Sequence, residues 1–360
     1  MKTNVSYKNS NLISVLSESL GEKMNLARIK LLAYFIISLC KVQTVNFKKL
    51  AIAFDTLAQA SSSLRRIQRF IANYSLNSDL IAQFIFHLLP EKENLRLTID
   101  RTNWKYGSVN INIFMLGVVY QGLAFPLLFS MLNKRGNSNS KERIALFNRF
   151  IALFGKDCIE CVIADREFVG KDWIVYLNKQ EIAYYIRIRK NFKVFLIQKQ
   201  KYVKAFWLFN AYHINQFVTY PKLVSINGQL SYISGAKLIR AEYLILISFH
   251  KVENSEEIYK QRWQIETCFK AIKTSGFNMQ DTHLQEIDRI RKLLLLLMIA
   301  FVWAYKIGIF LHQNVKAIKI KKHGRRAISL FKYGLEYITE VLLNAKKLDQ
   351  INMFSFLSCT

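Results

Sequence analysis

The sequence feature that most constrains the fold is an unbroken run of thirteen apolar residues, 293–305. A helix that is apolar on all sides must be surrounded by a protein core or by a membrane. Thirteen helical residues cover about 20 Å, whereas the hydrocarbon layer of a bilayer is about 30 Å thick. We therefore expect a core helix in a large folded body. The basic residues Arg289, Arg291 and Lys292 just before the run leave a membrane anchor as the alternative.

The charge of the chain indicates an anionic partner. Lys and Arg number 52 and Asp and Glu number 25, which gives a net charge of +27. A folded body with such an excess repels itself, so the excess is typical of proteins that bind a polyanion. Charge alone does not distinguish nucleic acid from an anionic membrane surface. The hydrophobic content of 51% excludes a disordered chain, and five scattered cysteines exclude a disulfide scaffold.

Residues 1–90 have the periodicity of helices. The pattern predicts helices at 26–40, 47–57 and 64–73, the last of them after a serine-rich turn. This last helix carries Arg65, Arg66 and Arg69, and with the helix before it forms the outline of a helix-turn-helix. We therefore predict a DNA-binding domain here, with a simple solvated arginine face as the alternative.

Beyond Pro90 the periodicity changes to strands interleaved with helices. We predict strands at 95–100, 109–120, 123–131, 158–164 and 183–188, and helices at 141–154 and 171–179. This alternation is typical of an α/β fold with a mixed sheet covered on both faces. Residues 190–248 are again mostly β in character, and the last hundred residues, from Glu253, are helical.

Two aspartates stand out by their place beside predicted strands. Asp100 ends the strand Leu-Thr-Ile-Asp, and Asp165 directly follows the strand Val-Ile-Ala. Sites in open α/β sheets form at such strand ends. The alternative for each is a turn-forming or helix-capping aspartate.

A third acidic residue belongs to a polar stripe on a helix predicted at 255–274. Tyr259, Arg262, Glu266 and Lys273 fall within about 60° of one another on a helical wheel, beside an apolar flank. Such a stripe is typical of a helix that borders a cleft, with a decorated surface as the alternative.

Three carboxylates converging on one site would suit phosphodiester chemistry. Two divalent cations about 3.5–4 Å apart activate an attacking oxygen and stabilise a leaving oxygen. Mg²⁺ prefers carboxylate oxygens, so Asp100, Asp165 and Glu266 are the predicted catalytic residues and metal ligands.

At these residues the sequence resembles a known family. Tyr259-x₂-Arg262-x₃-Glu266-x₆-Lys273 is similar to the Tyr-Arg-Glu-Lys signature of DDE transposases from one large group of bacterial insertion sequences, the insertion-sequence "four" family. The segments Thr98–Trp104 and Ala164–Phe168 resemble the two blocks that carry that family's first and second aspartates.

The resemblance implies cut-and-paste transposition by an RNase H-like mixed-sheet core with a mainly β insertion. It implies two Mg²⁺ ions per site, with Mn²⁺ as a substitute, and a homodimer that pairs the terminal inverted repeats of the element and attacks target DNA. On this basis we expect a first part of the core at 91–189, the insertion at 190–250 and a second part with the Glu-bearing helix at 251–312. Residues 1–90 match no signature of the family, and we expect a helical DNA-binding domain there from charge. A basic helical region is expected at 313–360.

The resemblance also assigns DNA contacts. Tyr259, Arg262 and Lys273 would contact phosphates or strand near the cut, and Arg166 belongs to the second aspartate block. Trp207 is the candidate to stack on a flipped base, with a core position as the alternative. Charge alone, rather than the resemblance, points to a basic block near the C-terminus as a phosphate-contacting surface, which includes Lys321, Lys322, Arg325 and Arg326.

Other functions remain open from the sequence. The chain could be a catalytically inactive DNA-binding descendant that acts as a regulator, a nuclease that cuts without joining, or a membrane-anchored basic protein. Residues 1–19 are polar and lack the apolar segment of a signal peptide. We therefore expect a cytoplasmic protein without a membrane partner, located in the bacterial cytosol and associated with the nucleoid when it is bound to DNA.

Overall fold

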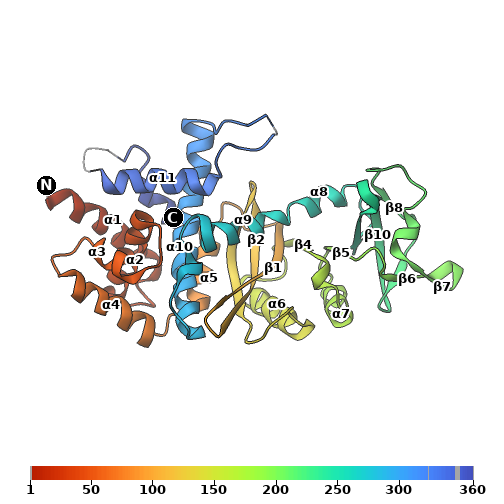
Figure 1. The fold of residues 1–360 in the computed structure, drawn as a ribbon, viewed down its shortest axis with the longest axis horizontal. Coiled ribbons are helices and arrows are strands. Elements are labelled where there is room, and N and C mark those ends of the chain that lie inside the picture. The colour runs from red at the N-terminus through yellow and green to blue at the C-terminus, as the bar shows by residue number, and fades with distance from the viewer. Residues whose placement is uncertain (1, 323, 345–348, 360) are drawn as a thin grey trace. The chain divides into compact units, whose positions relative to one another are not determined.

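The structure is a computed structural model, and it describes residues 2–322, 324–344 and 349–359. The chain divides into two compact units, each an assembly of distant segments (Figure 1). The helical unit consists of Met1–Pro90, Trp104–Val109 and Cys268–Thr360, and the sheet unit consists of Glu91–Asn103 and Asn110–Thr267. The fold is mixed α/β, as the sequence predicts.

In the described part of the chain, seven α-helices lie mainly or wholly in the segments of the helical unit. They are α1 (Lys2–Leu20), α2 (Leu26–Val42), α3 (Phe47–Ile52), α4 (Ala60–Asn73), α5 (Ser78–His87), α10 (Ile287–Phe310) and α11 (Leu330–Leu343). Asparagine side chains cap several of them: Asn25 accepts from the backbone of α2, Asn46 from α3 and Asn77 from α5. These caps replace hydrogen bonds that the first turn of a helix lacks.

The apolar run 293–305 forms the centre of α10, and every one of its residues is buried. Its basic flank is bound within the helical unit. Lys292 donates to the carbonyl of Ile71 at 3.0 Å and pairs with Asp288 at 2.7 Å, and Arg291 donates to the carbonyl of Leu76 at 3.0 Å. The basic residues that resembled a membrane anchor therefore serve the packing of this helix.

Among the residues that the structure describes, one helix, Ile287–Val315, is long enough and apolar enough to cross a membrane, judged by length and composition alone. Protein covers 89% of its most apolar stretch. Burial of this extent is typical of a core helix, and the prediction of a core position is confirmed.

Two glycines allow α10 and α11 to approach closely. A Cβ atom added at Gly308 would lie 1.8 Å from the carbonyl oxygen of Leu330, and one added at Gly334 would lie 1.8 Å from that of Ala304. Both distances are far shorter than any van der Waals contact, so the crossing of the two helices requires hydrogen in place of a side chain at both positions.

Gly334→Ala should therefore destabilise the protein by about 1–3 kcal/mol, the cost of overpacking. The sign of the change in the free energy of unfolding is the test. In a helix with open space around the position, alanine would stabilise the protein by up to about 1 kcal/mol over glycine. Chemical denaturation of the full chain measures the difference. An unchanged or higher free energy of unfolding in the variant would contradict the close approach.

The sheet unit is built around an eleven-stranded sheet with the order β3-β2-β1-β4-β5-β11-β10-β9-β6-β7, in which β8 pairs with β10. The strands are β1 (Leu95–Tyr106), β2 (Val109–Tyr120), β3 (Leu123–Met131), β4 (Ile159–Ala164), β5 (Tyr184–Arg187), β6 (Lys193–Leu196), β7 (Lys201–Lys204), β8 (Val218–Thr219), β9 (Val224–Ile226), β10 (Gln229–Lys237) and β11 (Tyr243–Ser248). The helices are α6 (Ser140–Phe154), α7 (Lys171–Lys179), α8 (Ser255–Lys260) and α9 (Trp263–Lys270), of which α9 ends beyond the limit of the unit.

The sheet is mixed. Strand β4 runs parallel to both β1 and β5, whereas β11 is antiparallel to β5 and β10. The predicted hairpin of β2 and β3 is confirmed at its predicted bounds. Its two turn residues, Gln121 and Gly122, have φ values of 46° and 95°, the left-handed pair that a two-residue hairpin turn requires.

Several elements differ from the sequence-based expectation. Helix α4 begins at Ala60, so the serines lie in its first turn, and α3 ends at Ile52 rather than at residue 57. Strand β1 continues to Tyr106 because Thr102, Trp104 and Tyr106 are good strand formers at alternate positions. Asp100 is therefore inside a strand and does not end one.

Candidate active site

Parallel pairing places the two aspartates next to each other. The ladder between β1 and β4 pairs Ile99 with Ala164 as its last partners. Asp100 and Asp165 are the next residues on the two strands, and neighbouring strands lie about 4.8 Å apart. The predicted convergence of these two carboxylates at one edge of the β1–β4 ladder therefore has a direct basis in the register.

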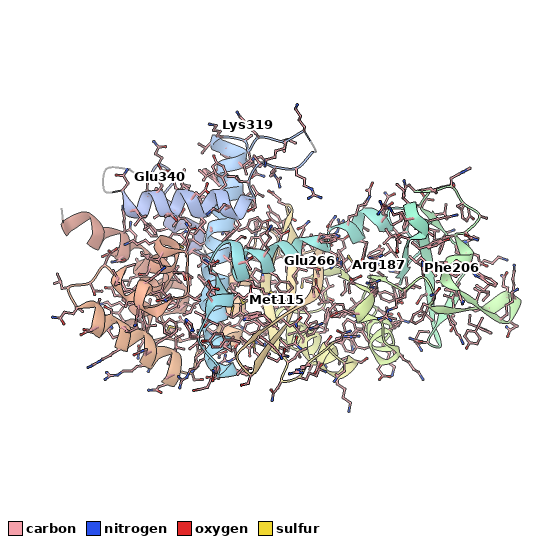
Figure 2. All side chains as sticks on the ribbon, in the orientation of Figure 1. Met115, Arg187, Phe206, Glu266, Lys319 and Glu340 are labelled. Atoms are coloured by element: carbon pink, nitrogen blue, oxygen red, sulfur yellow. The ribbon has the colours of Figure 1, made fainter. Side chains whose placement is uncertain are left out.

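Arg262 joins Asp100 to Glu266. Its guanidinium donates to Oδ2 of Asp100 at 3.3 Å and pairs with Oε1 of Glu266 at 2.8 Å (Glu266 is labelled in Figure 2). The Arg262 side chain is only 6% exposed, whereas that of Glu266 is 35% exposed. Tyr259, also buried, donates from its hydroxyl to Oδ1 of Asp165 at 3.2 Å. Two residues predicted to contact DNA thus contact all three of the predicted metal ligands.

The helix that carries these residues is divided, contrary to the single helix predicted at 255–274. Between α8 and α9 the backbone tightens: Arg262 N donates to the carbonyl of Tyr259, three residues earlier, and Ile265 N donates to that of Arg262. After α9 a π-helical turn runs from Ala271 to Ser275. A tight 3₁₀-type turn rotates the chain about the helix axis by a larger angle per residue than an α-helix does, and a π turn rotates it by a smaller angle. A regular α-helical wheel therefore does not describe how the polar residues predicted as one stripe are placed.

Lys273 belongs to this π turn and to the helical unit. Its ammonium lies 5.3 Å from the ring centroid of Trp104, within the range of a cation–π contact. Burial lowers the pKa of Lys273 from its ordinary value.

The segment that holds these residues also defines the family. The model of the family described as "Transposase DDE domain" matches residues 99–303, more than half of the chain. The chain belongs to the DDE transposases. The matched interval contains Asp100, Asp165 and Glu266 of this transposase, and also Lys273.

Among solved structures, the chain matches the cryo-EM structure of the piggyBac transposase synaptic complex with hairpin DNA. The identity is 10% and the TM-score 0.47, with 98% of this chain and 82% of that chain covered. No curated protein matches the transposase.

The electrostatics of the site show a shortage of positive charge at Asp100. Burial raises the pKa of Asp100 to about 7, although the backbone N–H of Arg101 and the charge of Arg262 favour its ionised form. Burial, together with the charge of Asp165, raises the pKa of Tyr259 to about 12. Tyr259 therefore stays a hydrogen-bond donor at neutral pH.

The carboxylates fit a hard divalent cation by their chemistry, because such ions prefer oxygen ligands and would compensate the buried Asp100. DDE transposases generally use divalent metal ions. Among the described residues, however, no group of three or more His, Cys, Asp or Glu side chains is arranged to hold an ion. A cation held by both Asp100 and Glu266 would therefore compete with the guanidinium of Arg262, which pairs with both carboxylates.

Sequence reasoning missed Arg143 of α6. This buried guanidinium donates to the carbonyl of Glu167 at 2.9 Å and lies 5.1 Å from the ring centroid of Phe168, so it holds the turn that follows Asp165. Burial lowers its pKa to about 10. A charge on the same helical face as the apolar residues Leu146 and Phe150 was the sequence feature that could have revealed it.

Two other residues predicted to contact DNA are exposed. Arg166 lies at the surface beside Asp165, and the side chain of Trp207 is 61% exposed in the short helix Ala205–Leu208, which excludes the alternative of a core position. Neither position has a described contact with the three carboxylates.

The C-terminal basic residues lie on a turn in place of the predicted helix. Ile320 and Arg326 form an isolated β-bridge, Lys321 N donates to the carbonyl of Arg325 at 2.8 Å, and Gly324 has a φ of 80°. The alternation of Ile and Lys favours an extended backbone over a helix. Lys321, Lys322, Arg325 and Arg326 are all exposed.

Arg262→Gln should lower the stability of the sheet unit in EDTA by about 3 kcal/mol, because it leaves a buried carboxylate without its cation. Millimolar Mg²⁺ should recover much of this loss, since the ion supplies the missing charge without the competing guanidinium. Thermal unfolding of the full chain measures both effects without any assay of activity.

The matched control is Lys260→Gln on the neighbouring helix α8. It removes an exposed pair with Glu256, worth at most about 1 kcal/mol. If Mg²⁺ raises the unfolding temperature equally in wild type, Arg262→Gln and the control, the carboxylates do not bind the ion in the way described.

Proposed function

We propose that this DDE transposase binds the ends of its own insertion sequence and catalyses metal-dependent cleavage and strand transfer. One observation carries the proposal: the last paired residues of β1 and β4 are followed directly by Asp100 and Asp165, and Arg262 links Asp100 to Glu266. Tyr259 donates to Asp165, and its ring centroid lies 6.0 Å from the guanidinium of Arg262, so the contacts of two neighbouring side chains connect three carboxylates from three separate segments.

In the proposed reaction the protein supplies the ligands and their orientation. Asp100, Asp165 and Glu266 would hold the divalent cations, two per site, with Mg²⁺ as the ion and Mn²⁺ as its substitute. When bound, the cations would activate the attacking oxygen and stabilise the leaving oxygen of a phosphodiester. The hydroxyl of Tyr259 orients Asp165 through its hydrogen bond. The guanidinium of Arg262, once displaced, would be free to bind a phosphate at the cut.

We further propose an RNase H-like core and membership in the group with the Tyr-Arg-Glu-Lys signature. The strand order β3-β2-β1-β4-β5 with a parallel β1-β4-β5 centre supports the first of these. Residues 1–90 would bind the ends of the element, and residues 190–250 would form the insertion. Trp207, Arg166 and the C-terminal residues Lys321, Lys322, Arg325 and Arg326 would contact DNA.

The proposed partners are the terminal inverted repeats and the target DNA, with a homodimer pairing the two ends. The net charge of +27 supports a DNA partner, since phosphate contacts supply most of the affinity for DNA backbones. We propose that the protein acts in the bacterial cytosol.

Asp165→Ala should reduce cleavage of linear DNA that spans the gene's own flanks by at least about 1,000-fold, the scale expected for an essential catalytic group. Binding of the same DNA in Ca²⁺ should stay within twofold of wild type. Asp172→Ala, which removes an exposed aspartate from α7, is the control and should cut normally.

The products separate the competing functions. Breaks at defined positions together with joined strand-transfer products support a transposase, and breaks alone indicate a nuclease that hydrolyses without joining. Binding by the wild type without any cleavage would indicate an inactive regulator.

Lys273→Ala should weaken binding to cleaved ends and reduce the slope of log affinity against log salt by roughly one unit, as expected for one lost phosphate contact. Lys270→Ala removes an exposed lysine three residues earlier and serves as the control. A slope equal to that of the control would count against a phosphate contact at Lys273.

A further inference from the structure

A hollow of about 370 Å³ in the helical unit is lined by the first turns of α2 and by one face of α4. Three arginines line it, Arg28 from α2 and Arg66 and Arg69 from α4. The α4 residues Phe70 and Asn73, together with Tyr74 just beyond the helix, complete its wall. We call this hollow the arginine pocket.

The charge of the arginine pocket is uniformly positive. None of its lining residues is acidic, and in the described parts of the chain no salt bridge involves Arg28, Arg66 or Arg69. Helix α2 has no acidic residue in its first turn, so its positive end adds to the field. Three like charges gathered without a carboxylate repel one another, and an anion bound among them would relieve that repulsion.

Aromatic rings restrict two of the three guanidinium groups, those of Arg28 and Arg66, before any ligand binds. That of Arg28 lies 4.1 Å from the ring centroid of Tyr74, and that of Arg66 lies 5.9 Å from the ring centroid of Tyr34. Stacking on an aromatic ring restricts a flexible side chain, so less entropy is lost when it forms hydrogen bonds. A simple solvated face would not be concave, and its arginines would not be stacked.

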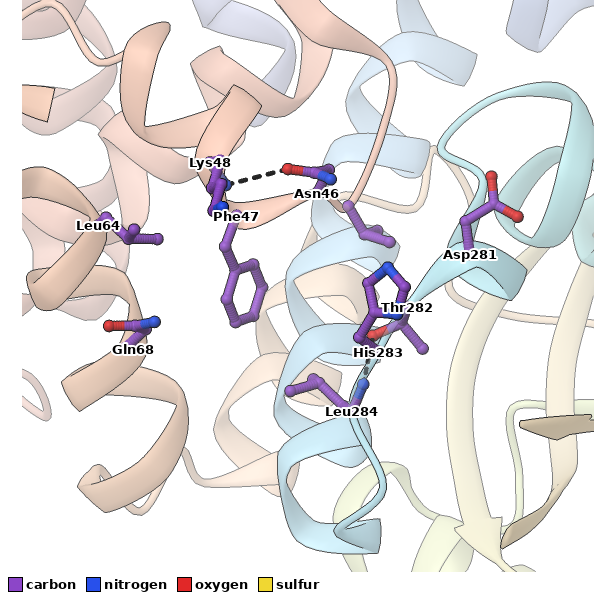
Figure 3. Close-up of a pocket in the computed structure, with 10 residues that line it drawn as sticks. Asn46, Phe47, Lys48, Leu64, Gln68, Asp281, Thr282, His283 and Leu284 are labelled. Atoms are coloured by element: carbon purple, nitrogen blue, oxygen red, sulfur yellow. Dashed lines mark hydrogen bonds between the residues drawn. The ribbon is translucent and has the colours of Figure 1, made fainter. Parts of the chain in front are cut away.

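A second hollow in the same unit differs in chemistry (Figure 3). Its volume is about 390 Å³, and Phe47, Leu64 and Leu284 make much of its lining apolar. Asp281 and Lys48 are also among its lining residues, so its charge is mixed. The uniform charge of the arginine pocket is therefore a property of that site and not of the unit as a whole.

We propose that the arginine pocket binds a backbone phosphate of DNA and that it anchors the duplex without reading its sequence. The planar fork of arginine matches the oxygens of a phosphate and donates two hydrogen bonds at once. Arg66 and Arg69, which the sequence places on the second helix of a helix-turn-helix outline, are thus assigned to the DNA backbone. Phosphate contacts position a protein without specifying bases. The inference rests on the proposed function, because DNA is the ligand.

The test measures the affinity of the full chain for two duplexes of equal length, one from the gene's own flank and one with the same bases scrambled. Fluorescence anisotropy at several salt concentrations gives both affinity and salt slope. Arg69→Gln should weaken binding to both duplexes by about tenfold, the loss expected for one charge-assisted hydrogen bond. The slope should fall by roughly one unit.

Arg65→Gln is the matched control, since it removes the same charge from the exposed face of the same helix but lies outside the pocket. Arg69→Lys tests the geometry: it should keep the salt slope of wild type but recover only part of the affinity, because lysine is a point charge without a fork. Unfolding temperatures equal to that of wild type show that the variants are folded.

The inference is overturned if Arg69→Gln and Arg65→Gln lose the same affinity, or if the loss at Arg69 is confined to the flank duplex, which would indicate base reading. Both results leave the proposed function intact, provided that the wild type binds DNA. A wild type that binds neither duplex overturns the proposed function first, and the inference with it.

Discussion

The pairing of β1 with β4 is the constraint on which the candidate site depends. Two parallel strands whose ladder ends at Ile99 and Ala164 bring the next residue of each, Asp100 and Asp165, to the same edge. A slip of one residue would turn one of the two carboxylates to the opposite face of the sheet. The buried apolar residues of both strands oppose such a slip, so the same packing that stabilises the sheet also sets the distance between the aspartates.

Arg262 is the second determinant of the site. A buried carboxylate such as Asp100 requires compensating charge, and here the guanidinium supplies it while it also pairs with Glu266. Arg262 compensates only part of the cost of burying Asp100, because burial still raises the pKa of this carboxyl to about 7. Arg262 nonetheless keeps Asp100 and Glu266 close together in the free protein. It would also compete with a cation for the same two carboxylates.

Sequence patterns predicted the α/β class, the β2–β3 hairpin, α7 and the burial of α10, because each depends on local periodicity and turn residues. They also identified the residues of the carboxylate network. They did not reveal the breaks on either side of α9, since Arg262 and Lys273 have no local feature that shortens or widens a helical turn. Two other features depend on tertiary packing, which the local pattern of a single sequence does not show. They are the contact of Arg143 with the turn after Asp165 and the proximity of Arg28 to Arg66 and Arg69.

The β-rich segment between β5 and β11 begins and ends on neighbouring strands, and its own strands extend the sheet beyond β11. Arg187 at the end of β5 lies opposite Leu246 of β11, and Ile188 N donates to the carbonyl of Ile245 at 2.9 Å. The strands on either side of the segment, β5 and β11, are thus hydrogen-bonded to each other. Strands β6 to β10 pair with one another and with β11, and none of these described strands pairs with β1, β4 or β5. A change in the length of this segment would therefore alter the sheet beyond β11 and leave the strand pairing beside the two aspartates as it is.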